Sequence, residues 1–214
     1  MTPETLHDHL LQLDLYNHLK TVAGYRSALR AAGRGFWAGT FSYDEFIDAF
    51  VTAIDIHFPR AWGEGMKAVG LSYPEDATLE ERNELDKLRI NEKSYIDGFA
   101  NAIEAASKAN GGKLADVYAR IERWVIRYNG IKSQAMQMAS NDPALVWVRN
   151  AADSCSSCLR LDGQVRRAST WRKYDLRPQS KRLECMKSSK GAPVCKCQLM
   201  PTQAPLTRGR FPAI

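Results

Sequence analysis

The sequence CSSCLRLDGQV at residues 155–165 and the sequence GAPVCKCQLMP at residues 191–201 bracket a segment that holds all five cysteines of the chain. Cys155 and Cys158 have the C-x-x-C spacing that lets two thiolates reach one tetrahedral ion from a single turn. Three further thiols follow in the same segment: Cys185, Cys195 and Cys197. Because structural zinc takes four ligands, this clustering predicts one structural zinc ion per chain.

The C-x-x-C pair and Cys185 are predicted as the first three metal ligands. Cys195 and Cys197 are alternatives for the fourth position, so one thiol remains free of the metal. The histidines lie far upstream in predicted helices and are poor ligand candidates: His7, His9, His18 and His57.

Two other interpretations of the cysteines remain open at this stage. Disulfides suit exported proteins, but the polar and acidic N-terminal sequence does not resemble a secretory signal, and five cysteines leave one unpaired. A thioredoxin-like redox pair requires a strand-to-helix context, whereas residues 159–163 after the C-x-x-C pair predict a turn.

The composition is typical of a soluble globular protein, with 44% hydrophobic and 25% charged residues. No apolar run approaches the length that crosses a bilayer, so we expect no membrane association and a reducing cytoplasmic compartment. No P-loop, spaced catalytic histidine or pair of catalytic carboxylates is evident, and a closed four-thiolate site leaves no position for an activated water. The sequence therefore predicts that the protein is not an enzyme.

The net charge of +6 is unevenly distributed along the chain. Residues 149–214 contain 14 Lys and Arg against 4 Asp and Glu, a net charge of +10, which leaves −4 for residues 1–148. A basic segment can contact nucleic acid or an acidic partner, or it can serve only to keep a small module soluble. The candidate contact residues interleave basic and aromatic side chains: Arg166, Arg167, Trp171, Arg172 and Lys173.

Residues 1–141 predict a helical platform. Ser42 with Glu45, and Thr78 with Glu81, have the spacing of capping boxes that begin helices. Glycines at 33, 35 and 39 are expected to end the first helix, and Pro59 is expected to kink or break the second. Two apolar stripes separated by residues 110–112 predict a long antiparallel helical hairpin over residues 78–140.

The second arm of this hairpin carries apolar residues on more than one stripe: Ile121, Trp124, Val125, Tyr128, Ile131, Met136 and Met138. One partner helix cannot cover so wide a face. Either the N-terminal helices cover it within a self-contained platform, or this face or the C-terminal tail binds a neighbouring subunit.

Residues 144–149, 164–166 and 197–200 predict three short strands around the cysteines, with the second strand following a turn at residues 162–163. The predicted fold is mainly α: a helical platform at 1–141, a small zinc-stapled β and loop module at 142–201, and an extended C-terminal arm at 202–214.

Several short sequences in the C-terminal module, taken in order, resemble the C-terminal module of tailed-phage minor head proteins, also called phage head-morphogenesis proteins. They lie at residues 146–148, 153–158, 161–165, 168–171, 176–179, 183–185 and 195–199. The resemblance covers roughly a quarter of the chain and does not extend to the helical platform.

The resemblance implies a structural phage virion protein, a minor head or neck component that acts in head assembly, portal association or genome delivery. It implies phage portal or capsid proteins as partners, contact with packaged DNA, oligomers in the virion, and location in the phage head or neck after assembly in the host cytoplasm. The alternative is a zinc-containing nucleic-acid-binding protein that uses the basic C-terminal module.

Overall fold

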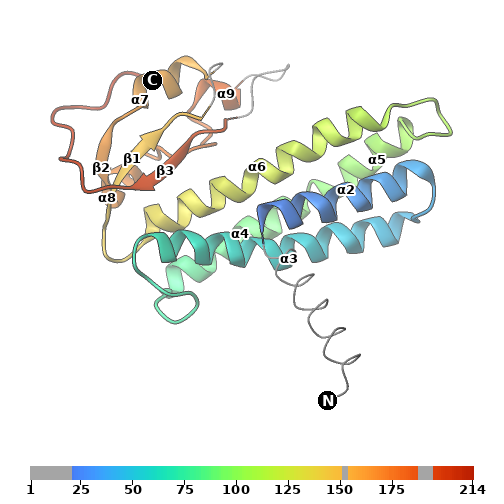
Figure 1. The fold of residues 1–214 in the computed structure, drawn as a ribbon, viewed down its shortest axis with the longest axis horizontal. Helices are drawn as coiled ribbons and strands as arrows, with labels where there is room; N and C mark the ends of the chain where they lie inside the picture. The colour runs from blue at the N-terminus through green and yellow to red at the C-terminus, as the bar shows by residue number, and fades with distance from the viewer. Residues whose placement is uncertain (1–20, 151–153, 188–194) are drawn as a thin grey trace, which may run out of the picture. The chain divides into compact units, whose positions relative to one another are not determined.

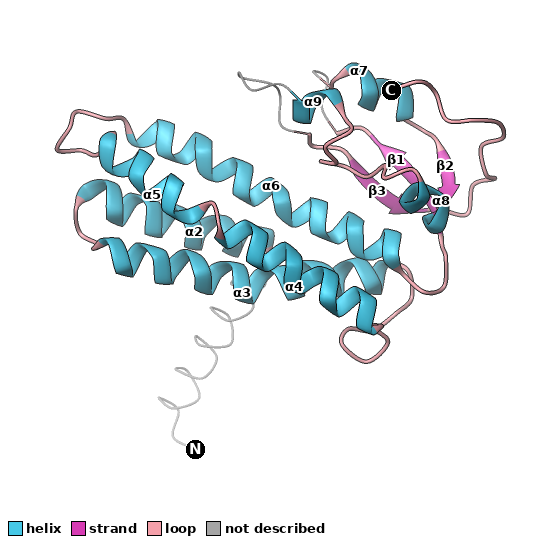
Figure 2. Cartoon of the chain, turned by 180° about the vertical axis from the view of Figure 1, so that it is seen from behind, coloured by secondary structure: helices cyan, strands magenta, loops and turns pink. Residues whose placement is uncertain are grey.

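The computed structural model describes residues 21–150, 154–187 and 195–214 (Figure 1). The predicted start of the first helix, near residue 3, lies outside these residues. The long helices are α2 (Val22–Ala38), α3 (Tyr43–Ala68), α4 (Leu79–Lys93), α5 (Ile96–Ala105) and α6 (Leu114–Met138). A small three-stranded sheet follows in the C-terminal region (Figure 2). The same region holds a cysteine cluster, and the predicted mainly α class is confirmed.

The described residues form two compact units, one from residues 21–60 and 88–125 and the other from residues 61–87, 126–150, 154–187 and 195–214. The second unit takes in the last part of α6. Met136 on α6 is a member of the apolar core that surrounds the cysteines. That residues 142–201 fold as a separate domain stays a prediction.

An aromatic cluster forms the centre of the first unit. Phe50 on α3 lies at its middle, with ring centroids 4.6 Å from Phe46, 5.6 Å from Phe99 and 5.4 Å from Trp124. Edge-to-face and tilted geometries of this kind add to the stabilisation that comes from burial. Trp124 belongs to the wide apolar face predicted on α6, and here that residue is buried within the chain itself.

Most of the wide apolar face is buried within the chain. The buried members of that face are Ile121, Trp124, Val125, Tyr128, Ile131 and Met136. Met136 packs in the core around the cysteines and not against the N-terminal helices alone, and binding of a neighbouring subunit stays a prediction.

Both predicted capping boxes are present. The Glu45 carboxylate accepts hydrogen bonds from the backbone N–H and the hydroxyl of Ser42, whose Oγ in turn accepts from the Glu45 N–H. Thr78 and Glu81 repeat the same reciprocal pattern before α4. Each box satisfies backbone donors that the first helical turn leaves without an intrahelical acceptor.

The prediction that three glycines end the first helix is wrong for two of them. Gly33 and Gly35 lie inside α2, and a Cβ at Gly33 would stand 2.7 Å from the Cδ1 of Ile121 on α6. Gly33 therefore allows the two helices to approach closely. Gly39 does end the helix, in the left-handed conformation with φ 76°.

Two predictions about where helices are interrupted have different outcomes. Pro59 does not break α3, which continues through it to Ala68, and the buried Phe58 and Trp62 near it offset the lost backbone donor. The predicted first arm of the hairpin is interrupted between α4 and α5 instead of continuing as one helix. There the Ser94 hydroxyl donates to the Asn91 carbonyl at 2.7 Å, a local bond that competes with the helical ladder.

The second unit contains the three predicted strands: β1 (Ala144–Val148), β2 (Val165–Arg167) and β3 (Gln198–Pro201). The strand order is β2-β1-β3, with both pairs antiparallel. The connection from β1 to β2 contains a helix, α7 (Ser156–Leu161), so the two strands do not form the simple hairpin implied by the sequence. The short helices α8 (Ala168–Lys173) and α9 (Glu184–Lys187) complete the unit.

The C-terminal tail contains no helix or strand after Pro201, yet it packs against its own unit. Thr207 exchanges hydrogen bonds with Val165 on β2, and its carbonyl accepts a bond from the Arg166 side chain. The Phe211 ring lies 5.1 Å from that of Trp171. The arm is extended, as predicted, but these contacts hold it along one edge of the sheet.

We predict that Gly65→Ala destabilises the second unit, because a Cβ there would stand 2.4 Å from the Lys132 carbonyl oxygen and 2.8 Å from the Ala135 Cβ. Overpacking against backbone costs about 1–3 kcal/mol, which lowers the melting temperature by several degrees. Gly63→Ala is the matched control, since its nearest neighbour lies at 3.6 Å and alanine favours the helix. Equal melting temperatures for the two variants would contradict the close approach.

We predict that His57 makes the stability depend on pH. Burial, followed by the charge of Arg60, lowers the pKa of His57 to about 4, and the ring is 2% exposed. Between pH 6.5 and about 4 the unfolded chain binds a proton that the folded chain does not. The free energy of unfolding therefore falls with falling pH, by up to about 1.4 kcal/mol per pH unit. Denaturant titrations at several pH values should show that His57→Phe makes the free energy of unfolding less dependent on pH. An unchanged pH dependence in the variant would refute the role of His57.

Candidate metal centre

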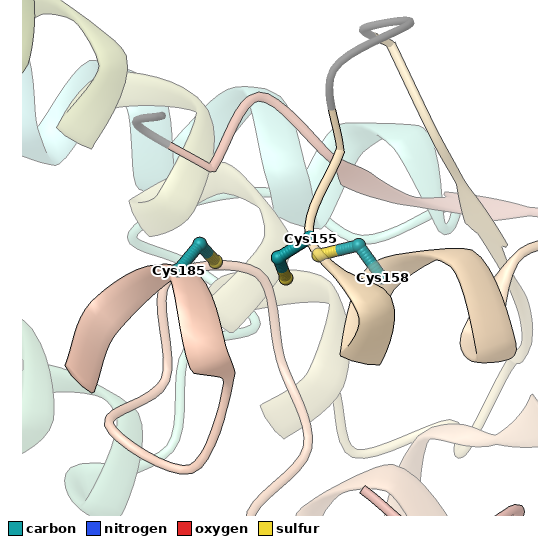
Figure 3. A group of neighbouring side chains, drawn as sticks. All are labelled: Cys155, Cys158 and Cys185. Carbon is teal, nitrogen blue, oxygen red and sulfur yellow. The ribbon is translucent and has the colours of Figure 1, made fainter. Parts of the chain in front are cut away.

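The five cysteines come from three separate parts of the second unit. Cys155 is the residue that caps the start of α7, and Cys158 lies within that helix. Cys185 lies on α9, and Cys195 and Cys197 come directly before β3. Figure 3 shows the side chains of Cys155, Cys158 and Cys185 converging from α7 and α9.

The sulfur atoms form two groups that share Cys158. In the first group, the sulfurs of Cys155, Cys158 and Cys185 all lie within 4.8 Å of one another. In the second, the sulfurs of Cys158, Cys195 and Cys197 do the same. Cys195 and Cys197 both reach the cluster because residues two apart on an extended chain point to the same side.

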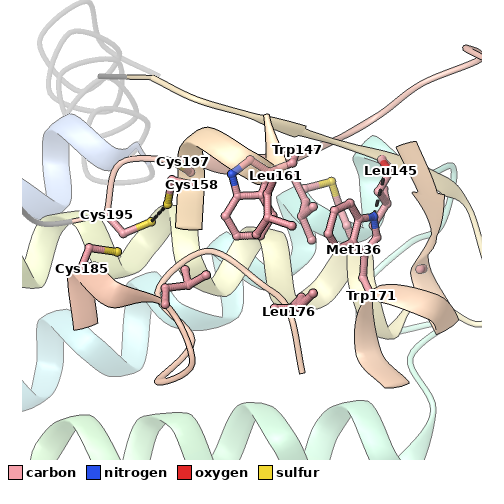
Figure 4. Close-up of a cluster of buried hydrophobic side chains, with 13 residues drawn as sticks. Met136, Leu145, Trp147, Cys158, Leu161, Trp171, Leu176, Cys185, Cys195 and Cys197 are labelled. Atoms are coloured by element: carbon pink, nitrogen blue, oxygen red, sulfur yellow. Dashed lines mark hydrogen bonds between the residues drawn. The ribbon is translucent and has the colours of Figure 1, made fainter. Parts of the chain in front are cut away.

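The spacing of the sulfurs fits a tetrahedral thiolate site. The sulfurs of Cys158 and Cys195 are 3.7 Å apart (Figure 4). Four sulfurs at the usual zinc–sulfur distance of about 2.3 Å would lie about 3.8 Å from one another. The cysteine cluster could therefore hold a metal ion, as predicted.

The cluster lies in an apolar core and is closed to solvent on most sides. Four of the cysteines are buried, and Cys155 is partly buried. The core around them is formed by Met136, Leu145, Trp147, Leu161, Ala168, Trp171, Leu176, Leu183 and Leu199. Such surroundings disfavour several thiolates together unless a cation compensates their charge.

The thiols influence one another strongly. Neighbouring thiols, that of Cys158 first, lower the pKa of Cys195, while contacts with Cys185 and Cys195 raise the pKa of Cys158. Burial raises the pKa of Cys155, but backbone N–H groups of Cys158 and Cys185 facing its sulfur outweigh burial and lower it. N–H groups aimed at a sulfur stabilise the thiolate form that binds metals.

Polar side chains around the cluster join the two helices that carry thiols. Ser156 on α7 donates a hydrogen bond to the Glu184 carboxylate on α9. The Ser157 hydroxyl accepts a bond from the Glu184 backbone N–H at 3.2 Å. These bonds fix the distance between the helix bearing Cys155 and Cys158 and the helix bearing Cys185. If the cluster holds a metal ion, Ser156, Ser157 and Glu184 would be outer partners that orient the ligands.

Gln179 connects the cluster to α6. It has the left-handed backbone conformation, with φ 66°, and its N–H faces the Cys195 sulfur. Its side chain donates to the Ile126 carbonyl at 2.8 Å and accepts from Arg127 at 3.2 Å. Gly130 makes room for it, since a Cβ there would stand 2.6 Å from the Gln179 Oε1.

Trp147 and Gln179 are parts of this centre that the sequence did not reveal. The indole nitrogen of Trp147 points toward Cys197 and has no hydrogen-bond partner among the described residues (Figure 4). Contact with Cys158 lowers the pKa of Cys197, but Cys195 and burial outweigh it and raise it to about 11. A tryptophan two residues before the end of a predicted strand carries no sequence signal for this role.

The predicted turn after the C-x-x-C pair begins later than the sequence indicates. The pair begins α7, which extends to Leu161, and the turn follows at residues 162–163. What separates the site from the thioredoxin arrangement is the sheet, because β1 and β2 are antiparallel and do not form a βαβ unit. All five cysteines are free in the structure, so no disulfide is formed among them.

The structure does not support Trp171 as a contact residue. Trp171 is fully buried, and its Nε1 donates to the Leu145 carbonyl at 3.0 Å. Arg166 is held by the tail through Thr207 and Gly209 and lies over the Phe211 ring.

The other three predicted contact residues lie on the surface: Arg167, Arg172 and Lys173. They are exposed because α8 buries only Ala168 and Trp171.

A comparison with protein-family models, with curated proteins and with solved structures found no match for this chain. In the described residues, none of the helices combines the length and the apolar character that crossing a membrane requires.

Proposed function

We propose that the second unit is organised by one structural zinc ion held by Cys155, Cys158, Cys185 and Cys195. The observation that carries this proposal is the convergence of five free thiols in an apolar core, with sulfur spacing suited to a tetrahedral ion. Thiolate ligands favour zinc over harder cations such as calcium or magnesium.

We assign the fourth position to Cys195 because its sulfur lies 3.7 Å from that of Cys158, the thiol that both groups share. The thiol of Cys195 also interacts with that of Cys185 in the first group. The sulfur of Cys197 is grouped with those of Cys158 and Cys195, and neither Cys155 nor Cys185 belongs to that group. Cys197 then remains a thiol beside the ion, with the Trp147 N–H facing its sulfur.

We expect elemental analysis of the purified chain to give about one zinc per molecule. Cys195→Ser should weaken metal binding by more than about 100-fold, since outer partners alone contribute about 10- to 100-fold. Cys197→Ser is the matched control and should keep the ion. Cobalt substitution should show tetrahedral thiolate absorption in the wild type and in this control.

Two results would overturn the assignment. One is a metal-free wild-type protein with intact disulfides. The other is a loss of metal in Cys197→Ser that is as large as the loss in Cys195→Ser. That result would contradict the choice of Cys195 over Cys197 as the fourth ligand.

We further propose that the chain is a structural protein of a tailed-phage virion, a minor head or neck component with a portal or capsid protein as its partner. The support is that the short sequences around the cysteines occur in the same order as in the C-terminal module of tailed-phage minor head proteins. The thiol cluster, whose geometry suits a structural ion, is a second support. A four-thiolate site of this kind leaves no position for a reacting water, so we infer a non-enzymatic role.

This role predicts stable association with a virion protein. The full chain, produced together with the portal or major capsid protein of the phage that encodes it, should co-purify with one of them in gel filtration. Purified virions should also contain the chain in few copies. A chain that stays separate from both proteins and is missing from virions would contradict the role.

Nucleic-acid binding through the basic module has less support. Trp171 is buried, and Arg166 is engaged by the tail. Arg172 lies 3.7 Å from Glu80, a weak exposed pair.

Of the remaining cations, Arg167 donates to the Asp142 carbonyl at 3.1 Å, and Lys173 lies on the surface beside the exposed Tyr174. The Tyr174 ring already packs against Phe211 of the tail, which limits its use for base stacking.

A further inference from the structure

A hollow of about 310 Å³ lies in the first unit, outside the basic C-terminal module. Three arginines four residues apart on α2 line it, together with Tyr118 from α6 and small residues. The complete lining is Ala23, Arg26, Ser27, Arg30, Ala31, Arg34 and Tyr118. Successive arginines rise about 6 Å along the helix axis, so they form one row of cations.

The polar side chains in this lining are guanidinium and hydroxyl groups, and the lining includes no carboxylate. A guanidinium can only donate hydrogen bonds, and a hydroxyl can donate one. The small side chains of Ala23 and Ala31 leave the guanidinium groups accessible. A ligand of this hollow must therefore supply acceptors and negative charge.

Glu122 on α6 forms ion pairs with two of the arginines and so limits the movement of their side chains. Its carboxylate accepts from the Arg26 Nε at 3.0 Å and from the Arg30 Nη2 at 2.7 Å. The Arg30 guanidinium also lies 4.9 Å from the centre of the Tyr118 ring. These contacts fix the orientation of the donors before any ligand arrives, which reduces the entropy lost on binding.

Arg34 provides binding capacity that the chain does not use. Arg34 is exposed, and no ion pair of its side chain is found in the described part of the chain. After Glu122 offsets one charge, the three arginines leave a local charge of +2. That matches a phosphate monoester or two diester phosphates better than one carboxylate.

We propose that this hollow between α2 and α6 binds phosphate groups. The ligand is a tetrahedral oxyanion that accepts paired hydrogen bonds from the guanidinium groups. Either a small phosphate or the successive phosphates of a nucleic-acid strand can supply this oxyanion. The site does not depend on the metal centre, because the residues that form it all belong to the first unit.

The test uses the full chain and three probes at matched ionic strength: inorganic pyrophosphate by calorimetry, and a labelled single-stranded oligonucleotide and a labelled oligoglutamate peptide by fluorescence anisotropy. Arg34→Gln should weaken binding of the phosphate probes about tenfold, because it removes one guanidinium from the row. The fold should be spared, since Arg34 makes no ion pair within the described ranges. Arg120→Gln removes one charge from an exposed site on α6 outside the hollow and should change binding less than twofold.

Binding of pyrophosphate alone identifies a small phosphate as the ligand, and binding of the oligonucleotide identifies a nucleic-acid strand. The proposal is overturned if neither phosphate probe binds, or if both variants weaken binding equally, which would indicate general electrostatic attraction. Oligoglutamate binding as tight as that of the phosphate probes would overturn the choice of phosphate.

Discussion

The constraint on which the second unit depends is the crowding of five thiols around Cys158 in an apolar core. Thiols this close cannot all ionise unless a cation compensates their charge. In water, nothing would hold the thiols together. The backbone N–H groups that face Cys155 and Cys195 hold the thiols in position and favour the ionised form. Helices α7 and α9, the turn at Gln179 and the start of β3 are all arranged around this point.

The three-stranded sheet is small, and the surrounding chain occupies both of its edges. On one edge, the Leu199 N–H of β3 donates to the Ser133 hydroxyl of α6. On the other, Thr207 in the tail bonds with Val165 of β2. An uncovered edge invites pairing with other chains, so these contacts protect the unit. They also explain why the metal centre and the last part of α6 belong to one compact unit.

Charge counted along the sequence is a poor guide to where anions can bind. The basic residues at 149–214 are partly used internally, as Arg166 shows by its bonds to the tail. The first 148 residues carry a net negative charge, yet they contain the row of three arginines on α2. A helix brings residues four apart onto one face, whereas a net charge sums over all faces. The local arrangement therefore matters more than the total.

The sequence by itself determined the mainly α class, both capping boxes, the three short strands and the cysteine cluster, because each has a local signal in spacing or residue type. Tertiary structure decided that α3 continues through Pro59 and that Gly33 is a contact point rather than a terminus. It also brought Gln179 and Trp147 to the thiols and buried Trp171. These outcomes depend on packing between residues far apart in the chain, and such contacts leave no periodic pattern to detect.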